Sequence, residues 1–187
     1  MSPSDKPVEK SGFTFIFMRA LLVLVMAGAV ASCTSDRPSF RGTEISDVDW
    51  GKDFRLMSHL GRPLSTEEFR GNILILFFGY THCPDICAPT LAKLATLRRQ
   101  LGADAAHVQV LFVTLDPKHD TPEQLARFIP GFDSSFIGLT GTPEQIAAVA
   151  RDYKVSYSQD HSSGSPPSIN HSGVMLVKDR HGRPRLL

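Results

Sequence analysis

Two cysteines stand four residues apart in the stretch FFGYTHCPDICAPTL, which runs from Phe77 to Leu91. Cys83 comes where an apolar run gives way to a predicted helix with Pro84 at its first position. We therefore expect Cys83 at the N-cap and Cys87 one turn further on. Positions four apart are neighbours on a helix surface, and sulfurs placed there can close a disulfide or share a metal ion. The spacing predicts a reactive or metal-binding pair.

The start of a helix also changes the chemistry of a thiol. Its partial positive charge favours the thiolate, which is the form that attacks disulfides and binds metals. We therefore expect lowered thiol pKa values at Cys83 and Cys87. A structural disulfide is the alternative interpretation, since exported proteins often contain one. Such a bond would close only a short loop here and would stabilise the fold little.

Other polar residues near the pair have two interpretations each. Asp85 falls on the first predicted helical turn, where a carboxylate suits the helix dipole, and it could also receive a lysine of a partner protein. Asp116 follows an apolar strand and either orients a group at the site or forms a turn. His82 adjoins Cys83 and is interpreted as a surface or supporting residue. His161 lies in a polar loop from which it could approach the site.

The first residues of the chain resemble an export signal. Lys6, Lys10 and Arg19 precede the uninterrupted apolar run 20–31, which Ser32 and Cys33 follow. The run is shorter than the roughly 20 apolar residues that a membrane-spanning helix needs. This pattern predicts a bacterial lipoprotein whose signal is removed and whose Cys33 is lipidated.

An uncleaved anchor is the second interpretation of the same segment. It joins the apolar residues 13–18 to the run 20–31 across Arg19, with Lys6 and Lys10 on the cytoplasmic side. Both interpretations export everything after residue 33. We therefore expect a protein of the bacterial cell membrane whose domain faces the periplasm or the cell exterior.

Length and charge limit the remaining possibilities. The chain has 187 residues and a formal net charge of +1, with no concentrated basic stretch, so we expect no nucleic-acid partner. The length suits one domain with its own core. We expect a signal peptide or anchor over residues 1–32, a polar tether over 33–49 and a folded domain over 50–187.

Apolar runs alternate with helical patterns along the folded domain. Thr121 and Thr142, each followed by proline, are typical N-cap residues. A hairpin is expected around the turn at Gly61 and Pro63. The pattern predicts an α/β fold, in which a mixed sheet with an N-terminal hairpin is flanked by helices on both sides. The expected strands cover 73–78, 108–114, 136–139 and 171–177, and the expected helices cover 84–101, 122–129 and 143–153.

The cysteine stretch resembles the signature of the Sco/SenC family of membrane-tethered copper proteins. The resemblance extends over roughly residues 54–177 and includes Leu115-Asp116-Pro117, Asp120-Thr121-Pro122, Tyr153 and His171. It implies a thioredoxin-like fold in which two cysteines and a histidine bind one copper ion. It also implies a role in building the dinuclear copper centre of cytochrome c oxidase subunit II. By match to the motif, the copper ligands would be Cys83, Cys87 and His171.

The chemistry of these side chains agrees with that implication. Thiolates are soft ligands that select Cu(I) or Zn(II), and copper accepts an imidazole in both the Cu(I) and Cu(II) states. We therefore expect a copper chaperone. Its expected partners are the copper domain of oxidase subunit II, other copper chaperones and thiol:disulfide oxidoreductases. The alternatives are a thiol:disulfide reductase acting on the cysteines of the oxidase copper site and a thioredoxin-fold peroxidase.

Two features depart from the family pattern. Lys118 and His119 occupy a place where an acidic and a basic residue are common. Family members also usually continue past the last hairpin into a C-terminal helix, whereas this sequence stops at Leu187. The resemblance therefore implies a truncated C-terminus and one sheet face without its helix.

Overall fold

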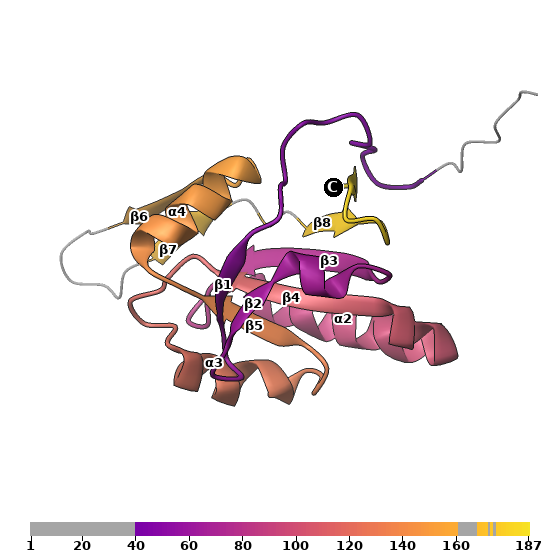
Figure 1. Ribbon diagram of the computed structural model, residues 1–187. Helices are drawn as coiled ribbons and strands as arrows, with labels where there is room; N and C mark the ends of the chain where they lie inside the picture. The colour runs from indigo at the N-terminus through magenta and orange to yellow at the C-terminus, as the bar shows by residue number, and fades with distance from the viewer. Residues whose placement is uncertain (1–39, 161–167, 172, 174) are drawn as a thin grey trace, which may run out of the picture. The chain divides into compact units, whose positions relative to one another are not determined.

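The computed structural model describes residues 40–160, 168–171, 173 and 175–187 (Figure 1). The signal or anchor predicted over 1–32, together with Cys33 and His161, lies outside the described residues. The unit that contains the cysteine pair begins at Phe40.

Seven strands form one mixed sheet in the order β2-β1-β5-β4-β3-β8-β9 (Figure 1). The central strands β3, β4 and β5 are parallel, whereas β8 pairs antiparallel with β3 and β1 pairs antiparallel with β5. This confirms the predicted mixed sheet, and the predicted hairpin is β1 with β2. The strands are β1 (Arg55–Ser58), β2 (Pro63–Ser65), β3 (Ile73–Gly79), β4 (Val108–Thr114), β5 (Ile137–Thr140), β8 (Met175–Lys178) and β9 (Pro184–Leu186).

The helices begin where local chemistry favours a start. The hydroxyls of Thr121 and Thr142 accept hydrogen bonds from backbone amides three residues on, as N-caps do, and proline follows each. Both predicted caps are confirmed. The α-helices are α2 (Cys87–Leu101), α3 (Pro122–Phe128) and α4 (Pro143–Asp152), and the 3-10 helices are η1 (Thr66–Phe69), η2 (Gly102–His107) and η3 (Ile129–Gly131).

The strand β3 is buried on both faces, which explains why its sequence is apolar at every position. On one face Leu76 and Phe78 pack in a cluster with Ile146 of α4. On the other face Phe77 and Leu91 of α2 belong to a second cluster, to which α3 also contributes. Helices therefore cover both sides of the sheet, as the sequence predicts.

The chain after α4 differs from the expected single strand 171–177. The strand β6 (Tyr157–Asp160) pairs antiparallel with β7 (Ser168–His171) in a separate two-stranded sheet, where Tyr157 lies opposite His171. The main sheet resumes only at β8, whose Leu176 is buried against β3. His171 thus ends one strand rather than beginning the next, because β7 and β8 pair with different partners.

The outer edge of β9 is covered by a segment that the sequence analysis assigns to the tether. The amide of Thr43 donates to the carbonyl of Leu187 at 3.1 Å, and the amide of Leu187 donates back at 2.9 Å. The amide of Ile45 donates to the carbonyl of Arg185 at 2.9 Å. Residues 43–45 therefore extend the hydrogen bonding of the sheet beyond its last strand.

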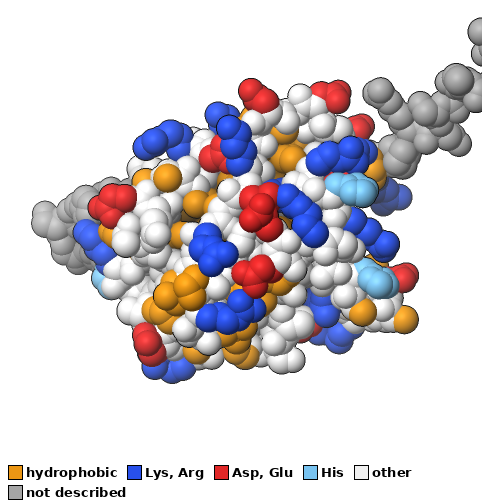
Figure 2. All heavy atoms as spheres, in the orientation of Figure 1, with side chains coloured by type: hydrophobic (Ala, Val, Ile, Leu, Met, Phe, Trp, Pro, Cys, Tyr) orange, Lys and Arg blue, Asp and Glu red, His pale blue; other side chains and the backbone are white. Residues whose placement is uncertain are grey.

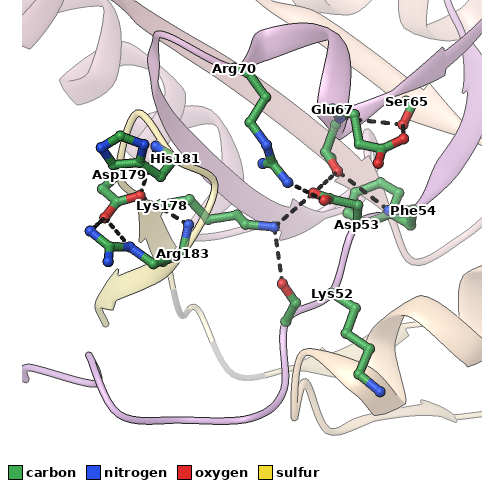
Figure 3. A network of polar contacts seen from close by, with 12 residues as sticks. Lys52, Asp53, Phe54, Ser65, Glu67, Arg70, Lys178, Asp179, His181 and Arg183 are labelled. Carbon is green, nitrogen blue, oxygen red and sulfur yellow. Dashed lines mark hydrogen bonds and ion pairs between the residues drawn. The ribbon is translucent and has the colours of Figure 1, made fainter.

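A buried lysine ties the start of the domain to β8 (Figure 3). The side chain of Lys178 is 1% exposed, and its ammonium donates to the Gly51 carbonyl at 3.0 Å and to the Tyr153 hydroxyl at 3.2 Å. It also pairs with the Asp53 carboxylate at 3.2 Å, and Arg70 contacts the same carboxylate. Burial lowers the pKa of Lys178, and these oxygens offset part of the cost of burying its charge.

Charges of both signs are interspersed on the face of the molecule that Figure 2 shows. Lysine and arginine side chains alternate there with aspartate and glutamate, and apolar side chains appear in small groups between them. Within the described ranges, no helix combines the length and the apolar character that crossing a membrane requires.

Candidate metal centre

The loop between β3 and α2 holds Cys83, and the first residue of α2 is Cys87. Cys83 is half-buried, whereas Cys87 is 1% exposed and belongs to the core cluster beneath α2. A side-chain hydrogen bond joins the two cysteines, which do not form a disulfide. The structure therefore brings the two side chains into contact, although Cys83 lies in the loop before the helix and not on the helix surface.

The floor of the site is a glycine. A Cβ atom built on Gly79 would lie 2.7 Å from the sulfur of Cys87, which is too short for a real side chain, and 3.0 Å from the Phe112 ring, which is tighter than most real contacts. Gly79 ends β3, so the strand leaves at its last position the space that the sulfur of Cys87 fills. The packing of the sheet thus fixes where this sulfur sits.

The helix starts three residues later than predicted. Cys83 is not the N-cap, because Ile86 holds that position and Cys87 is the first helical residue. Asp85 accordingly lies before the helix, exposed, and not on its first turn. The sequence signal for the true start is Pro89. Proline is tolerated only in the first turn, where amides have no intrahelical partner, and a helix starting at Pro84 would have placed it in the interior.

The expectation of lowered thiol pKa values is wrong for Cys87. Burial raises the pKa of Cys87 well above its ordinary value, and the hydrogen bond with Cys83 raises it further. A backbone hydrogen bond with Tyr80 acts in the opposite direction, and the charge of Asp120 adds to the rise. Desolvation thus outweighs the helix N-terminus at this sulfur. Because its pKa is raised, the Cys87 thiol does not ionise readily by itself. A metal cation that binds this sulfur must displace its proton.

A carboxylate that the sequence analysis does not assign lies between the ends of β3 and β4. Asp120 is 0% exposed, and its carboxylate accepts hydrogen bonds from both the amide and the hydroxyl of Thr81 and from the hydroxyl of Thr114. Burial raises the pKa of Asp120. The sequence shows this residue only as part of the Asp-Thr-Pro string before α3, which gives no sign of burial.

Asp116 proves to be a buried turn residue with a histidine partner. Its amide donates a hydrogen bond to the Thr114 hydroxyl oxygen, and its carboxylate lies 2.7 Å from Nδ1 of His119. The amides of His119 and Asp120 both donate to its carbonyl. Of the two interpretations offered for Asp116, the turn is the one with contacts in the structure.

The predicted ligand set is only partly visible. The structure places the backbone of His171 at the end of β7, but its side chain lies outside the description. Across the part of the chain that is described, no three side chains of His, Cys, Asp or Glu form a group that could hold a metal ion. His82, next to Cys83, is exposed, which agrees with a surface or supporting residue. The three-ligand set thus remains a prediction.

The two sulfurs themselves suit a soft metal ion. They are adjacent and approach from a loop and a helix start, where Cys83 is half-buried and Cys87 is packed in the core. Thiolates at this spacing can share one ion, and Cu(I) and Zn(II) are the ions that prefer such ligands. The residues present therefore fit a copper ion as a bound cargo.

Comparison with known proteins extends this picture. The protein SCO2 homolog, mitochondrial, of Bos taurus is 48% identical over 108 residues, which are 57% of this chain and 41% of that protein. The SCO2-like protein RC0895 of Rickettsia conorii is 34% identical over 139 residues, which are 73% of this chain and 68% of that protein. This chain therefore spans about two fifths of the length of the mammalian relative.

Solved structures of Sco proteins are also similar to this chain. Bradyrhizobium japonicum ScoI with copper bound has a TM-score of 0.69 and 32% identity, covering 72% of this chain and 86% of that one. Yeast Sco1 with copper bound has a TM-score of 0.67 and 30% identity, covering 73% and 78%. These matches confirm the expected thioredoxin-like fold of this group. The SCO1/SenC family model matches residues 42–186, and the chain therefore belongs to the SCO1/SenC family.

Proposed function

We propose that this chain is a copper-binding assembly factor that helps to metallate the dinuclear copper centre of cytochrome c oxidase subunit II. The observation that carries the proposal is the contact between the thiols of Cys83 and Cys87 at the start of α2. It occurs in a chain whose relatives from Bradyrhizobium, Arabidopsis and yeast hold copper in their structures. The thiolates would bind one copper ion, and His171 would complete the ligand set.

This ligand set suits a carrier. Two thiolates favour Cu(I), and an imidazole keeps Cu(II) acceptable, so the ion can change oxidation state while bound. Three protein ligands leave a coordination position open for a ligand of the recipient, whereas a structural zinc site normally closes with a fourth ligand. A disulfide between the same sulfurs would prevent binding, because metal binding requires the thiolates. Copper occupancy and thiol oxidation therefore exclude each other.

The same pair also supports a second function, that of a thiol:disulfide reductase acting on the cysteines of the oxidase copper site. Cys83 is half-buried and can reach another protein, while buried Cys87 is in hydrogen-bond contact to resolve a mixed disulfide. A peroxidase is less well supported. Such an enzyme needs a cysteine whose pKa is lowered by a nearby cation. Here burial raises the pKa of Cys87, and the charged group that acts on it, Asp120, is a carboxylate and not a cation.

The proposed setting rests on residues 1–33, whose sequence resembles an export signal. We place the domain outside a bacterial cell membrane, held there by the N-terminal segment. Its proposed partners are the copper domain of oxidase subunit II, other copper chaperones and thiol:disulfide oxidoreductases.

Copper analysis of the reduced full chain tests the proposal. We expect wild type to bind one copper ion, and Cys83→Ser and Cys87→Ser to lose it, while Cys33→Ser serves as the matched control. His171→Ala should weaken Cu(II) binding more than Cu(I) binding, with the exposed His107 replaced by alanine as its control. Full copper stoichiometry and an unchanged sulfur-to-copper absorption in Cys83→Ser would contradict the assignment of Cys83 as a copper ligand.

Transfer separates the two functions. Copper-loaded protein is mixed with the apo copper domain of oxidase subunit II, and reduced metal-free protein is mixed with the oxidised copper domain. Stoichiometric copper transfer supports the assembly factor. Reduction of the recipient disulfide without any copper transfer supports the reductase.

A further inference from the structure

The contacts of Asp120 join three segments that meet beside the cysteine pair. Its carboxylate accepts from the Thr81 amide at 3.0 Å and from the Thr81 hydroxyl at 2.5 Å. It also accepts from the Thr114 hydroxyl at 2.6 Å. Thr81 belongs to the cysteine loop and Thr114 ends β4, while Asp120 directly precedes Thr121, the N-cap of α3. One buried carboxylate thus holds the loop, the sheet and a helix start together.

Burying this carboxylate has an energetic cost that no ion pair among the described residues offsets. Its pKa is raised, first by burial, and hydrogen bonds with threonines are the favourable interactions. The charge that acts on it is that of Asp116, which has the same sign. Carboxylates buried without a cation are rare because desolvation is expensive. The hydrogen bonds of Asp120 therefore fix a conformation rather than neutralise a charge.

The conformation they fix is that of the turn before Cys83. Thr81 is two residues before Cys83, and its amide and hydroxyl both point to Asp120. The amide of Cys83 donates to the Tyr80 carbonyl at 3.3 Å, which closes the turn. Thr114, the other partner of the Asp120 carboxylate, is held within the sheet, because it pairs with Gly79 of the neighbouring strand β3. Gly79 in turn borders the sulfur of Cys87.

We propose that Asp120 is a positioning residue, which holds the turn Tyr80–Cys83 against the end of β4 so that the Cys83 sulfur stays within reach of Cys87. It presets the pair for closing a disulfide and for sharing one ion. The part of this inference that concerns copper rests on the proposed function. The part that concerns disulfide closure does not.

Two substitutions separate position from charge. Asp120→Asn keeps the shape and all three contacts. The amide oxygen can accept from the Thr81 amide and the Thr114 hydroxyl, and the amide nitrogen can donate to the Thr81 hydroxyl. That hydroxyl is then able to donate to Nδ1 of His82, which lies 3.1 Å away. Asp120→Ala removes every contact together with the charge.

The controls address stability. Ser58→Ala removes a buried hydroxyl that donates to the Arg62 carbonyl at 2.6 Å, in the β1–β2 hairpin, so it measures the effect of a lost buried hydrogen bond alone. Thr81→Val removes the hydroxyl contact and keeps the amide contact with Asp120. It is the milder variant that decides the question if Asp120→Ala does not fold. The thermal midpoint of unfolding is recorded for each variant.

The first readout is the rate of disulfide closure with oxidised glutathione. One thiolate attacks glutathione disulfide and releases one glutathione, and the second thiolate displaces the other glutathione, so the protein loses two electrons that the glutathione gains. The second readout is Cu(I) affinity in competition with a coloured chelator. For Asp120→Ala we expect both to fall by about tenfold or more, as is usual when a residue that orients a metal ligand is lost. Asp120→Asn should restore both to near wild type.

Each outcome decides between explanations. Unchanged closure and affinity in Asp120→Ala, or in Thr81→Val where the alanine variant does not fold, would overturn the proposal. Equal losses in Asp120→Asn and Asp120→Ala would show that the charge of Asp120, and not its position, matters. A loss in Ser58→Ala as large as that in Asp120→Ala would show a general effect of lowered stability. If wild type binds no copper but closure follows the expected order, the proposed function fails and the positioning role stands.

Discussion

Gly79 and Cys87 lie in direct contact, so close that a methyl group on the glycine would overlap the cysteine sulfur. The last residue of β3 and the first residue of α2 therefore pack against each other across the loop that contains Cys83. This contact sets the depth at which one sulfur of the pair is held.

Gly79→Ala should displace the Cys87 sulfur. The new methyl group would lie 2.7 Å from that sulfur and 3.0 Å from Phe112, so one of them must move, at a cost of about 1–3 kcal/mol as in other overpacked cores. We expect a lower urea midpoint and slower disulfide closure. Gly131→Ala is the matched control, because no heavy atom lies within 4 Å of its added Cβ. Equal behaviour of the two variants would show that the sulfur is not confined.

Cys83 should react before Cys87 with an alkylating reagent at neutral pH. Cys83 is half-buried, whereas Cys87 is 1% exposed and burial raises its pKa, so Cys87 is hard to reach and ionises less readily than an ordinary thiol. Peptide mapping after short exposure to iodoacetamide measures the order. Preferential labelling of Cys87 in folded protein would contradict it.

Stability should fall at alkaline pH in part because of Cys87. Its pKa is raised in the folded state, so its contribution to stability is complete below the ordinary thiol pKa and is lost as pH rises through the higher folded value. Chemical unfolding midpoints measured from neutral to alkaline pH give the slope. Cys87→Ala should show a shallower decline than wild type, since Tyr153 and Lys178 titrate in both proteins. Identical slopes would exclude the contribution.

The two partners of the buried ion pair should differ in their cost of removal. Asp53→Ala leaves the ammonium of Lys178, 1% exposed, without its carboxylate, and losing one partner of a buried pair typically costs about 3–5 kcal/mol. Lys178→Met should cost less, because Asp53 keeps Arg70 and Thr66 and is 23% exposed. Urea unfolding of both variants measures the difference. A larger loss in Lys178→Met would reverse this account.

The membrane attachment can be decided by mass. If Cys33 is lipidated after signal cleavage, protein extracted from membranes should begin at Cys33 and carry several acyl chains, since one chain alone binds a membrane only marginally. Cys33→Ser should then stay unprocessed. An unmodified N-terminus that retains residues 20–31 would indicate the uncleaved anchor instead.

Much of the fold could be predicted because its signals are local. The apolar run that becomes β3 identifies a strand with helices on both faces, and Thr121 and Thr142 mark helix starts by their own chemistry. The contact of Cys83 with Cys87 agrees with the predicted pair, although Cys83 lies in the loop before α2, so the helical spacing on which the prediction is based does not apply.

The features that sequence reasoning missed depend on distant parts of the chain. The burial of Asp120 depends on Thr81, 39 positions away, and that of Lys178 depends on Asp53, 125 positions away. The pKa of Cys87 follows packing by β3 rather than the helix start. The helix start is the exception, since Pro89 is a local signal for a start at Cys87, whereas Pro84 is an equally local signal for an earlier one.

Both edges of the seven-stranded sheet offer little to an added strand. On one side residues 43–45 already pair with 185–187, which uses the outer hydrogen-bonding groups of β9. On the other side β2 has three residues and begins with Pro63, which cannot donate a hydrogen bond. An extended peptide therefore finds no ready template at either edge, and recognition by strand addition is disfavoured at this sheet.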